Sequence, residues 1–144
     1  MDTFEGGTGD GEYVSPTRER EIRELGEKVR RCLAAAGLPA TVRNDYSSFV
    51  GADIMLHFDI IPRTGELGGV YVSWSATDEI DLAAALAVEA FRPADPMVKY
   101  SGAIGRAMCD AMLAILASAG FAVKEAEGEY HPVTVKVLSG PDAS

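Results

Sequence analysis

Cysteine, histidine and tryptophan are scarce in this chain of 144 residues, which contains two, two and one of them. Cys32 and Cys109 lie within helical patterns, and neither has a second cysteine or a histidine at metal-ligand spacing, so we expect reduced thiols in the core and no metal site. The chain also lacks a long apolar run and a signal-peptide pattern. These absences favour a soluble, cytoplasmic protein without a membrane partner or a cofactor.

An excess of positive charge is absent as well, because the net charge is −9. A strongly acidic protein repels phosphate backbones and anionic lipids, which argues against nucleic acid or a membrane as the partner. Six of the 13 basic residues lie between Arg18 and Arg31, where they alternate with glutamates. This segment is therefore expected to be a solvated helix face with side-chain pairs.

The composition, 47% hydrophobic and 24% charged, is that of an ordinary globular protein with one core. Residues 1–14 are rich in glycine and acidic residues and lack apolar periodicity, so they are expected to form a disordered leader. A single domain is expected over residues 15–138, followed by a polar tail over residues 139–144.

Hydrophobic periodicity predicts the order of helices and strands. Helical spacing and capping residues predict three helices: 16–36, 77–91 and 101–119. Alternation and turn residues predict strands or extended pieces: 40–46, 52–61, 70–76, 121–125 and 130–137. The order predicts an α+β fold of two layers, a mostly antiparallel sheet of four to five strands with three helices packed against it. The helix over 77–91 is apolar nearly all round, and we expect it to be heavily buried.

A hairpin of the second and third strands would gather polar side chains on one face. A symmetric register about the turn places His57 opposite Ser73 and Asp59 opposite Tyr71. These residue types invite comparison with nucleophilic catalysis, but the chain has no G-x-S-x-G pattern. A solvated sheet face is the favoured interpretation. A metal site that adds His131 is disfavoured because no paired histidine spacing occurs.

The segment from Ser101 to Arg106 supplies a second candidate site. If a helix begins at Ser101, its first N–H groups, near Gly102 and Gly105, could hold an anion together with Arg106. The segment lacks the lysine of a P-loop. Small residues that allow close helix packing are the simpler explanation.

The leading hypothesis from the sequence is a non-enzymatic protein-binding module, an adaptor, chaperone or inhibitor, with a protein partner or a second copy of itself. Met97, Met108 and Met112 form an adaptable apolar group of the kind that lines binding surfaces, but core packing is the default expectation for them. The alternative is a small-ligand-binding or regulatory domain with the anion site at Ser101 to Arg106. An enzyme that uses His57 and Asp59 is the third hypothesis.

Overall fold

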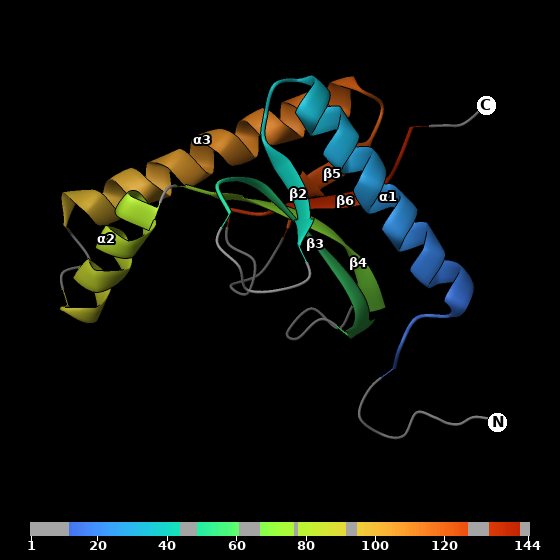
Figure 1. Cartoon of the computed structure of the whole chain (residues 1–144), viewed down its shortest axis with the longest axis horizontal. Coiled ribbons are helices and arrows are strands. Elements are labelled where there is room, and N and C mark those ends of the chain that lie inside the picture. The colour runs from blue at the N-terminus through green and yellow to red at the C-terminus, as the bar shows by residue number, and fades with distance from the viewer. Residues whose placement is uncertain are drawn as a thin grey trace.

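The computed structural model describes residues 12–43, 49–60, 67–76, 78–91, 95–126 and 133–141. These residues form three helices and five strands (Figure 1). Their order is α1 (Pro16–Ala35), β2 (Ala40–Arg43), β3 (Gly51–Ile60), β4 (Leu67–Ser75), α2 (Asp78–Glu89), α3 (Pro96–Ser118), β5 (Ala122–Glu125) and β6 (Val135–Ser139). The predicted α+β class with a mostly antiparallel sheet is confirmed. None of the described helices has an apolar stretch long enough to span a bilayer.

The sheet is open and mixed, with the strand order β2-β3-β4-β6-β5. β2 runs parallel to β3, and the other neighbours are antiparallel. The hairpin of β3 and β4 forms as predicted, but Leu56 pairs with Val70 rather than with Trp74. The predicted register is therefore wrong by four residues, because β4 begins at Leu67 and includes two glycines that the sequence suggested were part of the turn. An even shift leaves each side chain on the expected face.

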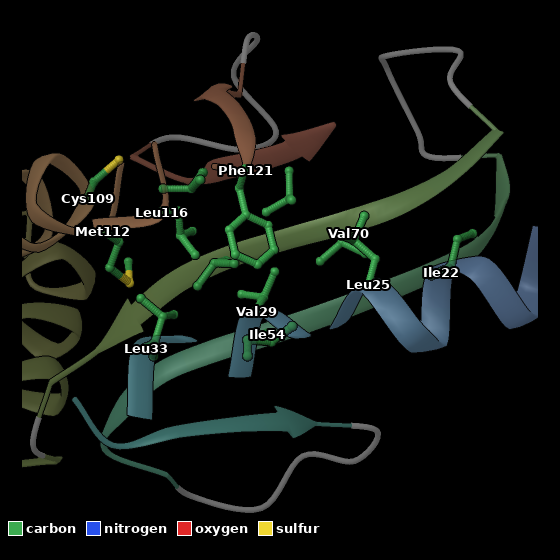
Figure 2. Close-up of a cluster of buried hydrophobic side chains, with 14 of the residues drawn as sticks. Ile22, Leu25, Val29, Leu33, Ile54, Val70, Cys109, Met112, Leu116 and Phe121 are labelled. Carbon is green, nitrogen blue, oxygen red and sulfur yellow. The ribbon is translucent and has the colours of Figure 1, made fainter. Parts of the chain in front are cut away.

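The main core lies between one face of the sheet and two helices, α1 and the C-terminal part of α3. Figure 2 shows its side chains gathered between these elements. The stripe predicted on α1 is confirmed, because Ile22, Leu25, Val29 and Leu33 are buried. The hydroxyl of Ser15 accepts a hydrogen bond from the backbone N–H of Arg18, so α1 begins with the predicted cap.

The two central helices differ from the prediction. α2 packs mainly against α3, and Figure 1 shows both extending beyond the sheet. Among the described side chains of α2 only Ala87 is buried, so the expectation of a heavily buried helix is wrong. α3 begins at Pro96 rather than at Ser101, because the carboxylate of Asp95 accepts a hydrogen bond from the N–H of Met97 and caps the helix five residues earlier.

The N-terminal segment joins the sheet just before α1. Residues 1–11 of the expected disordered leader lie outside the described residues, whereas Tyr13 and Val14 are described. Tyr13 forms an isolated antiparallel bridge with Asp59. Val14 is buried, and its N–H donates to the carbonyl of Phe58 at 2.8 Å. The folded domain therefore includes Tyr13 and Val14, because they continue the pairing at the end of β3.

Candidate functional site

The polar face of the β3–β4 hairpin is partly buried, and the candidate residues on it do not lie together as expected. Tyr71 is only 1% exposed and pairs with Met55, and its ring meets the His57 ring edge-on at 5.4 Å between centroids. Ser73 pairs with Asp53 rather than with His57. Asp59 lies at the exposed end of β3. The predicted pairings of His57 with Ser73 and of Asp59 with Tyr71 are wrong because of the register shift, and His131 lies outside the described residues.

An ion pair that sequence reasoning missed lies on this face. The guanidinium of Arg43 on β2 holds the carboxylate of Asp53 on β3 with two contacts, of 3.1 and 2.9 Å. The Asp53 side chain is 7% exposed, so the pair is largely removed from water. Two opposite charges on neighbouring extended segments were the only signal in the sequence, and the pairing requires the parallel register of β2 and β3. The mutual pairing of these charges indicates a structural role.

The anion site predicted at Ser101 to Arg106 does not lie at the start of a helix. Ser101, Gly102 and Gly105 lie inside α3, where their N–H groups belong to the helix ladder rather than to its first turn. Arg106 makes two contacts with Glu125 on β5, at 2.9 and 3.0 Å, and a third with Asp110 at 3.2 Å. This guanidinium holds the pKa of the Glu125 carboxyl below its usual range. Arg106 therefore ties α3 to the edge strand. A methyl group added at Gly102 would meet nothing within 4 Å, so close helix packing does not explain that glycine either.

Charged side chains along α1 pair with one another as the sequence predicted. Arg30 and Arg31 both bind the carboxylate of Glu27, at 2.6 and 3.3 Å. The hydrogen bond from Arg30 is the largest of the effects that lower the pKa of Glu27 to about 2. A shallow hollow on this side of the helix is lined by charges of both signs. The surface of α1 is thus a network of ion pairs rather than a cationic patch.

The strongest candidate for a binding surface is on α2, where the usual burial pattern is inverted. Ala87 is 2% exposed, whereas Leu82 and Leu86, one turn apart, are 58% and 52% exposed. Val88 and Phe91 are exposed as well. We call Leu82, Leu86, Val88 and Phe91 the hairpin face, after the helical hairpin formed by α2 and α3. The helix directs a small residue inward and large apolar residues into water.

Small inward residues explain how α2 can pack closely on α3. Ala83 and Ala84 are half-buried and Ala87 is buried, so these small residues of α2, together with the half-buried Ile80, lie on its inward side. Of the three methionines in the adaptable apolar group, Met112 is fully buried in the main core, in line with the default expectation of core packing, and Met97 and Met108 are half-buried. The apolar surface available to a partner therefore comes from α2 and not from the methionines. The composition of the helix predicted its hydrophobicity but not its direction.

Within the described part of the chain, no three His, Cys, Asp or Glu side chains lie together in a metal-binding arrangement. Both cysteines are free thiols, as predicted, and burial raises the pKa of each. Comparison with protein-family models, with curated proteins and with solved structures finds no match to this chain.

Proposed function

We propose that this chain is a protein-binding domain, acting as an adaptor, chaperone or inhibitor, whose partner docks on the hairpin face. The observation that carries the proposal is the inverted burial of α2. Complete burial of a leucine is worth about 1.5–3 kcal/mol relative to full exposure, and the domain alone gains only about half of that energy at Leu82 and Leu86. A partner that covers them recovers the rest.

Two neighbouring exposed leucines distinguish this surface from the single apolar side chains that every protein leaves in contact with water. Single exposed leucines are normal, but contiguous apolar surface marks interaction sites. Leu82 and Leu86 are one helical turn apart and therefore adjacent on the surface of α2, and Val88 and Phe91 are exposed near its C-terminal end. They also belong to the element that extends beyond the sheet, where a partner can approach without obstruction from the core layer (Figure 1).

The net charge of the chain and the reduced state of its cysteines support the proposed class of partner and its compartment. The net charge of −9 disfavours nucleic acid and anionic lipid, which leaves protein as the partner that fits an apolar helical surface. The two thiols, one buried and one half-buried, suit the reducing conditions of the cytoplasm. We therefore place the interaction between this domain and another protein in that compartment.

A capture experiment with matched variants tests the proposal. Tagged wild type is compared in host-cell extract with the double variant Leu82→Gln/Leu86→Gln, because glutamine keeps helix propensity while it removes the apolar surface. Leu138→Thr on β6 is the control, since this leucine is also exposed but lies away from the hairpin. We expect a protein retained by the wild type and by the control to be lost from the double variant. An identical set of proteins on all three baits would refute the proposal.

A further inference from the structure

Each of the three described helices is followed by a residue with positive φ, but after α2 this residue is not glycine. Gly37 after α1 and Gly120 after α3 both have φ of 99°, and each N–H donates to the carbonyl three residues earlier. Phe91 after α2 occupies the equivalent position, with φ of 59° and a 3.0 Å bond from its N–H to the carbonyl of Val88. Glycine is the usual residue there because a side chain is strained at positive φ.

Phe91 gains no compensating contact within the described structure, because its side chain is 91% exposed. A bulky residue in the left-handed region is a genuine outlier, and such outliers cluster at functional sites. The strain and the exposure are both unfavourable to the isolated domain. Both are explained if the ring enters a partner, since large aromatic residues are the anchors of protein interfaces.

Glu89 is a second unfavourable choice in the same turn. The C-terminus of a helix carries partial negative charge and favours cations, yet the last turn of α2 has no basic residue and has this exposed carboxylate. No hydrogen bond or ion pair to Glu89 is found among the described residues. The hairpin region, residues 78–105, has five acidic and two basic residues. The end of α2 thus combines an exposed ring with an exposed carboxylate that pairs with none of the described side chains.

We propose that Phe91 and Glu89 form the anchor of the docking surface, and that the partner is a different protein whose apolar helix face is flanked by lysine or arginine. Phe91 inserts between the partner's apolar side chains, and Glu89 pairs with a flanking cation. A second copy of the chain fits less well, because it would bring an equally acidic hairpin against this one. The inference rests on the proposed function and specifies the partner and the residues that select it.

A synthetic peptide supplies the probe for this partner chemistry. The peptide is an amphipathic helix of about five turns, leucine on one face and lysine on the other, with a fluorophore for anisotropy titration. A scrambled peptide of the same composition keeps the charge but lacks the apolar face. A third peptide replaces lysine with glutamate. Titrations use the full chain, and sedimentation velocity over the same concentrations reports self-association.

Variants then separate binding from folding. Phe91→Gly is expected to lower the affinity for the lysine peptide by about tenfold or more, because the ring is lost. The same substitution should raise Tm by about 2–4 °C, because the backbone strain is relieved. Glu89→Lys should also lower the affinity for the lysine peptide. It should raise Tm slightly, because the C-terminal end of the helix gains a favourable positive charge. Leu138→Thr should leave the peptide affinity unchanged. A merely structural role for either residue would lower Tm on substitution.

Several outcomes would overturn the inference. These are equal binding of the scrambled or glutamate peptide, no binding of the lysine peptide, or unchanged affinity in Phe91→Gly. Reversible dimers of the wild type that Phe91→Gly abolishes would assign the surface to a second copy. The failure remains distinguishable from failure of the proposed function: a cellular protein captured through Leu82 and Leu86 would stand even if the peptide did not bind.

Discussion

Two adjacent residues of α2 should respond to substitution in the reverse of the usual order. Leu86→Ala removes a leucine that is 52% exposed, so only about half of its transfer energy is lost, about 0.8–1.5 kcal/mol. Ala87→Leu adds a large side chain at a position that is 2% exposed and faces the crowded contact with α3. Overpacking of this kind costs about 1–3 kcal/mol. Leu86→Ala should therefore destabilise the domain less than Ala87→Leu.

Urea unfolding followed by circular dichroism measures both changes at a protein concentration low enough to exclude self-association. Leu33→Ala serves as the comparison because Leu33 is fully buried, and its truncation should cost about 2–5 kcal/mol. The m-values should stay constant across the series. If Leu86→Ala cost as much as Leu33→Ala, or if Ala87→Leu were neutral, α2 would present the opposite face to α3 and the hairpin face would not exist.

Three further predictions concern the ion pairs and thiols. Asp53→Ala should destabilise the domain by about 2–4 kcal/mol, because Arg43 loses its partner in a largely buried pair, and the same urea titration measures the loss. The pKa of Glu27 is lowered from 4.5 to about 2, so its stabilising effect is complete above pH 4.5 and is lost as the pH falls toward 2. The stability difference between wild type and Glu27→Gln should shrink over that interval, and an unchanged difference would contradict the ion pairing on α1. Burial raises the pKa of the Cys109 thiol, so Ellman's reagent should modify it far more slowly in the native than in the unfolded protein.

Local signals in the sequence were sufficient for much of the fold. The Ser15 and Pro16 pair and the apolar stripe predicted α1 because capping and periodicity act within a few residues. Alternation in β3 and β4 identified the core face even though the register was wrong, since a shift of four residues preserves the side of every side chain. Asp95 and Pro96 gave the same capping signal as Ser15 and Pro16, but the prolines nearby suggested a loop.

The candidate site depended on information that local patterns do not contain. An Ala- and Leu-rich helix is hydrophobic on every side, so which side of α2 faces inward is set by its packing on α3 rather than by its own composition. The pairing of Arg43 with Asp53 needs a parallel register between segments ten residues apart. The strained position of Phe91 could not be predicted, because the usual signal, a glycine after the helix, is absent there.

Site-specific photocross-linking in living cells tests most directly whether the hairpin face binds a protein. A photoreactive phenylalanine analogue replaces Leu86 or Phe91 in one set of cells and Leu138 in another, and all three positions are exposed in the isolated domain. We predict one heavier adduct, containing a second and different polypeptide, from positions 86 and 91 and none from position 138. Absence of any adduct from positions 86 and 91, or the same adduct from all three, would contradict the account.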